Sequence, residues 1–222
     1  MVLRAETDMN TDDLITSLTQ ELSATPPNAL IRLLSKGLLL GTAGSLLIFS
    51  IGYGIRDDLA QALYSWPFWM KWTYAISMTL SAYLVCERLA RPGVKLNWLL
   101  LLPLLPSIML LGVAMQTLWA APAELRKVLL LGHSALYCPF NIGLLSLPIF
   151  AALCRTLRRA APTRLRLTGF IAGILSGAIA TALYCLYCNE SSVAFVAAWY
   201  TAGMLLPAVL GALYGRTLLR WT

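Results

Sequence analysis

The sequence has few charged residues for its length. Of its 222 residues, 12% are Asp, Glu, Lys or Arg, whereas 59% are hydrophobic. A soluble domain carries about 25% charged and about 45–50% apolar residues, so an ordinary water-soluble globule is excluded. A disordered chain, which is polar and highly charged, is excluded as well. The composition indicates a polytopic membrane protein.

Several hallmarks of enzymes and transporters are also missing. The chain has one histidine, and it contains no Ser-His-Asp set, no H-E-x-x-H pair and no phosphate-binding glycine loop. No Asp, Glu, Lys or Arg lies in the middle of any long apolar stretch, where ion-coupled transporters keep ionisable residues. We therefore expect no enzymatic activity, and a small-solute transporter is the less favoured alternative.

What the sequence does have is six apolar stretches, each close to the 20 or so residues that a membrane-spanning helix needs. They run over Gly37–Tyr53, Phe68–Cys86, Leu96–Gln116, Val128–Cys154, Leu167–Cys188 and Val193–Tyr214. The predicted fold class is all-α: a six-transmembrane-helix bundle with short loops, spanning residues 37–222, that follows a cytoplasmic N-terminal head at residues 1–36.

The basic residues alternate between the two ends of these stretches. Thirteen of the 17 Lys and Arg residues fall on the side that holds both termini, and Arg56, Lys71, Arg126 and Lys127 fall on the other. Cytoplasmic loops of membrane proteins are enriched in Lys and Arg, so both termini are predicted to be cytoplasmic. The net charge of +7 then reflects orientation in the bilayer, and no direct nucleic-acid partner is expected.

The loop between the fourth and fifth stretches is the most basic segment. It carries Arg155, Arg158, Arg159, Arg164 and Arg166. Control of membrane orientation, together with contact with lipid headgroups, is the favoured interpretation. A second contact for a protein partner is the alternative.

The head contains a predicted acidic amphipathic helix. Thr11 can cap its start, and acids in the first turn suit the helix dipole. Pro26 and Pro27 end it. The residues expected to bind a partner are Asp12, Asp13, Leu14, Ile15, Leu18, Glu21 and Leu22. A short helix of this kind is marginal alone in water, so it packs either on the basic loops of its own chain or in a groove on a cytoplasmic partner.

The outer side is predicted to gather a cluster of soft ligands. Cys188 ends the fifth stretch, Cys185 lies one turn deeper, and Cys138 lies in the fourth stretch below His133. Thiolate and imidazole suit zinc or a heavier metal such as cadmium, so these four residues are candidate metal ligands. A disulfide and a sulfur redox switch stay open as alternatives, and His133 also fits a structural role. Cys86 and Cys154, at the cytoplasmic ends of their stretches, fit small buried hydrophobes.

The chain resembles the NrsF family of six-span bacterial inner-membrane proteins. The resemblance covers nearly the whole chain through an ordered set of short segments. These are Thr11–Ile15, Arg56–Leu59, Pro67–Lys71, Ala90–Gly93, Leu131–Ser134 with Cys138, Ala161–Arg164, Cys188 with Phe195–Tyr200, and Gly215–Trp221.

The resemblance implies a membrane anti-sigma factor in the bacterial inner membrane. Members of the family hold a cytoplasmic extracytoplasmic-function sigma factor inactive and release it under heavy-metal or oxidative stress. The two cysteines that this response needs correspond to Cys138 and Cys188. The family often has His-Cys at the second site, where this chain has Tyr187, and it carries an additional Cys185. A membrane thiol oxidoreductase that uses Cys185 and Cys188 with quinone is the alternative from a different class.

Overall fold

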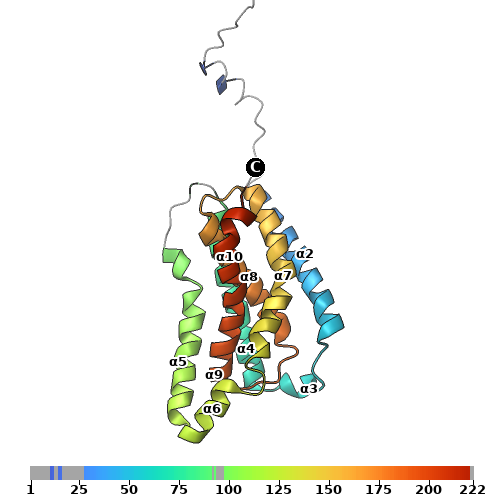
Figure 1. Ribbon diagram of the computed structural model, residues 1–222, viewed down its shortest axis with the longest axis vertical. Coiled ribbons are helices and arrows are strands. Elements are labelled where there is room, and N and C mark those ends of the chain that lie inside the picture. Colours follow the sequence, from blue (N-terminus) through green and yellow to red (C-terminus); the bar gives the residue numbers. More distant parts are fainter. Residues whose placement is uncertain (1–10, 13–14, 17–27, 92, 94–97, 221–222) are drawn as a thin grey trace, which may run out of the picture.

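The computed structural model describes residues 11–12, 15–16, 28–91, 93 and 98–220. Its elements are α2 (Ala29–Gly52), α3 (Leu59–Ala62), α4 (Trp66–Ala90), η1 (Trp98–Leu101), α5 (Leu104–Ala120), α6 (Ala123–Leu131), α7 (Tyr137–Ala160), α8 (Leu165–Tyr184), α9 (Val193–Phe195), η2 (Val196–Tyr200) and α10 (Thr201–Leu218). The described residues contain helices and turns but no strand, which confirms the all-α class (Figure 1).

Five segments are long and apolar enough to cross a membrane. They are Ala29–Gly52, Trp98–Ala120, Tyr137–Ala160, Leu165–Tyr184 and Val193–Leu218. Helix α4 is not among them, although its 25 residues would extend about 37 Å at 1.5 Å per residue. Lys71, Glu87 and Arg88 dilute its apolar character. Five of the six predicted spans therefore have a candidate helix, and the crossing of the membrane by α4 stays a prediction.

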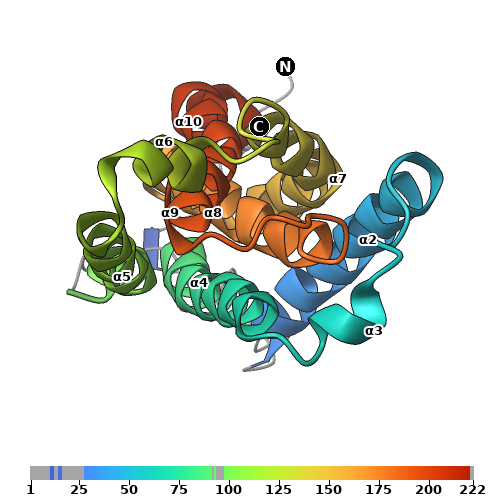
Figure 2. The same ribbon diagram turned by 90° about the horizontal axis from the view of Figure 1, so that it is seen from below.

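Helix α8 occupies the centre of the bundle. Viewed from one end, α2, α4, α7 and α10 surround it, and α5 lies at the margin (Figure 2). Of the most apolar 18 residues of α8, 72% are buried, against 11% for the α5 segment. The sequence explains this position, because α8 carries Gly169, Gly173 and Gly177 at every fourth residue and so presents a face without side chains.

Glycines bring α8 and α10 into backbone contact. A Cβ atom built on Gly169 would lie 2.1 Å from the Gly211 carbonyl oxygen, and one built on Gly211 would lie 2.0 Å from the Gly169 oxygen. Helices α2 and α7 approach in the same way at Gly41, whose Cβ would lie 2.5 Å from the Ile149 Cα. Ser45 adds a hydrogen bond of 2.6 Å from its hydroxyl to the Leu145 carbonyl oxygen. Such close contacts are typical of helix packing in membranes.

The last long helix begins irregularly. A π-helical turn, η2, separates the short α9 from α10, and its five residues end at the buried Tyr200. Two side chains around this turn reach the end of α6: Ser192 donates to the Leu129 carbonyl oxygen at 2.6 Å, and the Trp199 indole donates to the Leu130 oxygen at 2.8 Å. Ser192 before α9 and Trp199 within the turn thus dock α6 onto the bundle.

The bounds of the fourth and fifth predicted spans are wrong. The expected span Val128–Cys154 is two helices, because Gly132 adopts a left-handed φ of +50° that ends α6 before α7 begins at Tyr137. Cys138 is therefore the second residue of α7, not a residue well inside a longer span. The fifth span ends at Tyr184, so Cys185 and Cys188 lie in the turn that follows α8 and not on a regular helix.

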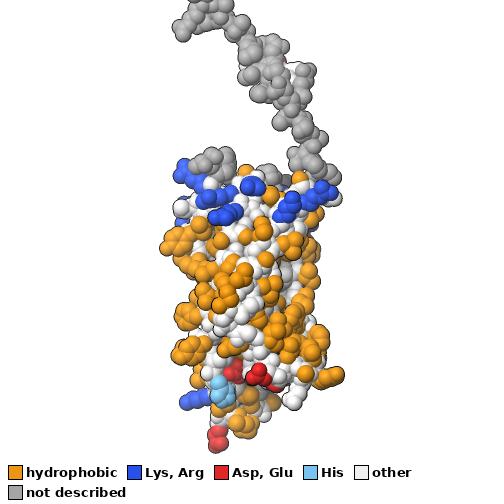
Figure 3. All heavy atoms as spheres, turned by 90° about the vertical axis from the view of Figure 1, so that its right-hand side faces the viewer, with side chains coloured by type: hydrophobic (Ala, Val, Ile, Leu, Met, Phe, Trp, Pro, Cys, Tyr) orange, Lys and Arg blue, Asp and Glu red, His pale blue; other side chains and the backbone are white. Residues whose placement is uncertain are grey.

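The two ends of the bundle differ in charge. The start of α2, the end of α7 and the end of α10 lie at one end (Figure 1). Lys and Arg side chains gather there, whereas the histidine and acidic side chains visible in the same view lie toward the opposite end (Figure 3). We call them the basic end and the acidic end. Hydrophobic side chains cover the surface between them, as expected for a surface that faces lipid.

Candidate functional site

Three cysteines meet at the acidic end. Cys138 enters from the start of α7, whereas Cys185 and Cys188 come from the turn after α8. All three are buried free thiols. The Cys138 thiol lies within electrostatic range of both Cys185 and Cys188. The prediction that these cysteines share one side of the molecule agrees with this arrangement.

An aromatic hydroxyl completes the surroundings of the thiols. Tyr200 is fully buried, and its ring packs edge-on against Tyr184 with 6.0 Å between centroids. Its hydroxyl lies within electrostatic range of all three cysteines. It has no hydrogen bond of regular geometry within the described residues. Cys138 and Cys185 are therefore fully enclosed at the end of α8, whereas Cys188 keeps 3% of its surface exposed.

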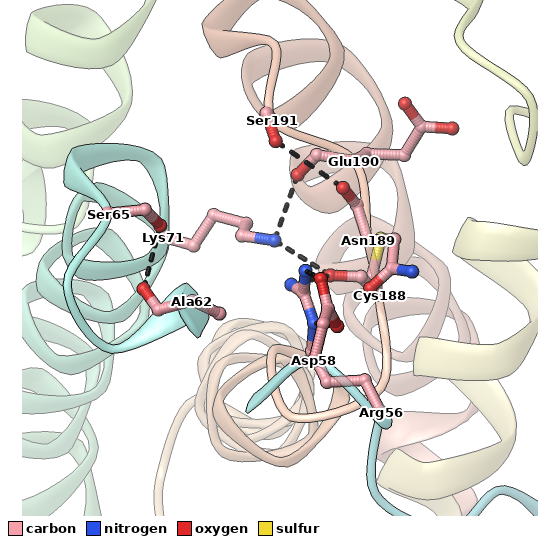
Figure 4. A network of polar contacts seen from close by, with 9 residues as sticks. All are labelled: Arg56, Asp58, Ala62, Ser65, Lys71, Cys188, Asn189, Glu190 and Ser191. Atoms are coloured by element: carbon pink, nitrogen blue, oxygen red, sulfur yellow. Dashed lines mark hydrogen bonds and ion pairs between the residues drawn. The ribbon is translucent and has the colours of Figure 1, made fainter. Parts of the chain in front are cut away.

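A buried lysine holds the loop that carries Cys188. Lys71 of α4 is 1% exposed, and its ammonium donates to the carbonyl oxygens of Cys188 at 2.8 Å and Glu190 at 2.9 Å (Figure 4). Arg56 donates to the same Cys188 oxygen at 3.2 Å. A charge is costly to bury without partners. The Cys188 carbonyl thus links α4, the loop after α2 and the turn after α8, and we call these contacts the cationic clamp.

Arg56 is itself fixed by an acid. Its guanidinium makes two hydrogen bonds of 2.5 Å to the Asp58 carboxylate, in the two-point geometry that favours Arg over Lys. The hydrogen bond from Arg56 lowers the pKa of Asp58, and the same bond raises the pKa of Arg56. Both groups are therefore held in their charged forms.

Glu190 joins the same loop to the break between α6 and α7. Its carboxylate accepts from the His133 backbone N–H at 2.6 Å and from the Ser134 hydroxyl at 3.3 Å. Gly132 suits this turn because its φ of +50° favours glycine, and the Glu190 carboxylate lies 2.6 Å from the position that a Cβ would take. The loops at the acidic end are thus joined by charge-assisted bonds.

A cavity of about 630 Å³ opens over this network. Its lining combines aromatic and charged side chains, among them Tyr53, Arg56, Asp57, Asp58, His133, Ser134, Tyr184, Tyr187, Asn189 and Glu190. Cys188 also lines it. A small polar molecule that enters this cavity therefore reaches the residues around one of the two predicted sensing cysteines.

The four predicted metal ligands differ sharply in exposure. His133 is 94% exposed, and its Nδ1 lies 3.8 Å from Glu190, whereas Cys138, Cys185 and Cys188 are buried. Within the part of the chain that the structure describes, no group of three or more His, Cys, Asp or Glu residues is placed to hold a metal ion. This arrangement does not fit a site that His133 shares with the cysteines, and the zinc or heavy-metal site stays a prediction.

Most of the predicted partner-binding helix lies outside the described residues. Asp13, Leu14, Leu18, Glu21 and Leu22 are in that part of the head. The described positions Thr11, Asp12, Ile15 and Thr16 are helical, and the Thr16 hydroxyl donates to the Asp12 carbonyl oxygen at 2.7 Å. The helical prediction agrees with these four positions only.

The basic loop is short and lies at the basic end. Arg155, Arg158 and Arg159 lie on the last turns of α7, and Arg164 and Arg166 flank the start of α8. Arg158 has an internal role, because its guanidinium donates to the carbonyl oxygens of Thr217 and Leu218 after α10.

Lys71 is the residue that the sequence prediction missed. Because Lys71 lies near the end of its predicted span, it was counted among the charges that set membrane orientation. A stronger signal was available, since it lies inside the predicted span Phe68–Cys86. An ionisable residue inside an apolar span is expensive and is by default a functional candidate. Its partners are backbone carbonyls, which no sequence motif reveals.

These features define a class of protein: a helical bundle with membrane-spanning character and a buried thiol cluster at one end. The chain belongs to the NrsF family, described as negative regulator of sigma F, whose model matches residues 18–221. It is 38% identical to the probable anti-sigma-F factor NrsF of Azospira oryzae over 96% of this chain and all of that protein. It is 35% identical to the anti-sigma-F factor NrsF of Caulobacter vibrioides, again over 96% of this chain and all of the relative. No solved structure matches the chain. The family is one of regulatory proteins rather than enzymes.

Proposed function

We propose that this chain is a multi-pass anti-sigma factor of the bacterial inner membrane that holds a sigma factor at the cytoplasmic face. The observation that carries the proposal is the identity of 38% and 35% to anti-sigma-F factors along almost the entire chain. Helix α4 is the sixth span, because it is as long as its neighbours and packs against the central α8. The basic end faces the cytoplasm, in accordance with the distribution of Lys and Arg.

The acidic head is the proposed sigma-binding element. The sigma factor is of the extracytoplasmic-function type, and its promoter-binding surfaces are basic, so an acidic amphipathic helix is a complementary ligand. The head leads directly into α2, and α2 begins at the basic end (Figure 1). The start of α2 at the basic end supports the proposal that a bound sigma factor lies against the loops of that end.

A matched pair of substitutions tests the head. Leu18→Asp introduces a charge into the predicted apolar stripe, whereas Gln20→Asp introduces the same charge on the opposite face of the helix. We expect Leu18→Asp to abolish co-purification of the sigma factor with the full-length protein and to release a sigma-dependent reporter, with Gln20→Asp unchanged. Repression that persists after deletion of residues 1–22 would refute this role of the head.

The cysteine cluster is the proposed sensor of oxidative stress. The Cys138 and Cys188 thiols lose two electrons and two protons to hydrogen peroxide, which is reduced to two molecules of water, and the disulfide that forms joins α7 to the turn after α8. Release requires that the oxidised and reduced forms favour different packings of the bundle. The cationic clamp supports this mechanism, since it ties the backbone of Cys188 to α4 and to the loop after α2.

The sensor is tested with two pairs of cysteines. We expect Cys138→Ala with Cys188→Ala to keep basal repression and to lose induction by peroxide. The control pair, Cys86→Ala with Cys154→Ala, alters buried thiols nearer the basic end and should leave induction intact. Normal induction in the first variant overturns the sensing role. The amount of this variant in the membrane is measured in parallel. A loss of repression without stress that accompanies a low amount of protein reports misfolding rather than a loss of sensing.

A further inference from the structure

A groove at the basic end is not used by the proposed function. It runs between α2 and α7, encloses about 610 Å³, and is lined by Leu33, Lys36, Leu40, Pro148, Ala151 and Arg155 together with neighbouring small residues and Arg159. We infer that this groove binds one anionic phospholipid of the cytoplasmic leaflet. The inference depends on the membrane location proposed above but not on the sigma factor.

The charges at the mouth of the groove lack partners. Lys36, Arg155 and Arg159 are exposed, and none of them makes an ion pair or hydrogen bond with another described residue. Arg158, on the same turns of α7, differs in that it bonds to the backbone after α10. Arg155 and Arg159 lie one turn apart on α7, and Lys36 of α2 lines the same groove. Three free cations gathered in this way form a site for a phosphate group.

The floor of the groove is apolar and follows the helix axes. Below the charges, α2 contributes Leu40 and α7 contributes Ala151 and Pro148. Arg155 and Pro148 are seven residues apart, which is about 10 Å along a helix. A charged mouth above an apolar channel matches the order of the groups in a phospholipid, whose charged headgroup lies at the membrane surface and whose acyl chains extend into the bilayer. Figure 3 shows the same order on the face it displays, with Lys and Arg side chains above hydrophobic ones.

The packing of α2 on α7 gives the groove its depth. A Cβ built on Gly37 would lie 2.3 Å from the Thr156 hydroxyl oxygen, so the two helices touch along this line with no side chain between them. Larger residues flank the line of contact and leave a channel beside it. The shape is fixed by backbone contacts and does not require the lipid in order to form.

Native mass spectrometry of the purified full-length protein in detergent tests the inference. The probe is dioleoyl phosphatidylglycerol, compared with the phosphatidylcholine of the same chains. We expect one retained phosphatidylglycerol and little retained phosphatidylcholine. Arg155→Gln with Arg159→Gln should weaken binding about 25-fold, on the basis of about fivefold for each basic residue removed near an anionic lipid.

Two further variants make the test specific. Arg216→Gln with Arg220→Gln removes two arginines of the same spacing and exposure at the same end, outside the groove, and should leave binding unchanged. Ala151→Phe fills the apolar floor at an exposed position and should weaken binding of the lipid at least tenfold without affecting that of free glycerol phosphate.

Each other outcome overturns the inference. Equal losses in the two arginine pairs indicate general adsorption of anions. Lipid binding that Ala151→Phe leaves unchanged indicates a site for the phosphate group alone rather than a lipid site. If Arg155→Gln with Arg159→Gln abolishes co-purification of the sigma factor while lipid remains bound, the groove is a protein interface. Co-purification in all variants measures the proposed function independently.

Discussion

At the basic end of the bundle the helices meet backbone to backbone, whereas at the acidic end polar side chains join them. Gly169 and Gly211 bring α8 and α10 together near the basic end, and Lys36, Arg155 and Arg159 stay free at its surface. At the acidic end, Lys71 and Glu190 are fully engaged with loop backbone atoms. The free charges at the basic end are therefore available to partners, whereas the charges named at the acidic end hold its loops together.

The largest effect is expected from a glycine at the basic end. Gly211→Val places atoms within about 2 Å of the Gly169 carbonyl oxygen, and because the obstacle is backbone, α8 and α10 must separate. We expect a loss of more than about 3 kcal/mol in the free energy of unfolding, measured by thermal unfolding in detergent. Gly112→Ala is the control, since a Cβ there meets nothing within 4 Å; it should stabilise α5 by about 0.5 kcal/mol. Equal behaviour of both variants would show that close helix contact does not hold this end together.

The next largest effect is expected at Lys71. Lys71→Met removes both ammonium hydrogen bonds, and the Cys188 carbonyl keeps only Arg56 as a donor among the described residues. We expect a loss of about 2 kcal/mol in the free energy of unfolding and faster alkylation of Cys188, because its loop is less firmly held. Lys127→Met, at an exposed position of α6, is the matched control. A stable variant with a slowly reacting Cys188 would contradict the role of the clamp.

A smaller effect is expected at Glu190. Glu190→Gln keeps the shape of the side chain but removes the charge that strengthens its bonds to the His133 N–H and the Ser134 hydroxyl. We expect a loss of about 1 kcal/mol and faster hydrogen exchange at residues 132–136. Glu124→Gln, in the first turn of α6, changes the same charge outside this network. If exchange at the turn is unchanged in Glu190→Gln, the turn is held by its own backbone geometry.

The smallest effect is a pH dependence at Asp58. Because Arg56 lowers the pKa of this carboxyl below its ordinary value of 3.8, the pair stabilises the fold above that pH. The stabilisation is lost as the pH falls through the lower, folded value. The melting temperature of Asp58→Asn should therefore fall less steeply below about pH 4 than that of the parent protein. Asp57→Asn, one residue away and without an ion pair in the described structure, should keep the slope of the parent protein. Identical slopes in all three proteins would mean that the pair does not couple to folding.

The helical class could be predicted because long apolar runs have few structures open to them in a bilayer. The break at Gly132 could not, since a left-handed φ within an apolar run leaves no trace in averaged hydrophobicity. The cysteines were predicted to share one end of the bundle, but the sequence did not reveal that the buried rings of Tyr184 and Tyr200, from different helices, pack together at that end. Lys71 was overlooked as a site residue because its partners are backbone atoms 117 and 119 residues further along the chain.

The π-helical turn at Val196–Tyr200 also determines which changes of length the chain tolerates. It holds one more residue than an α-helix would over the same rise. Each residue of an α-helix turns the chain by about 100°. A single-residue deletion in η2 would therefore rotate Ser192, which bonds to α6, away from its partner if Gly211 kept its contact with α8. The length of this turn sets the rotation of the contact with α6 relative to the contact with α8. Substitutions in the turn should therefore destabilise the protein far less than a deletion or an insertion.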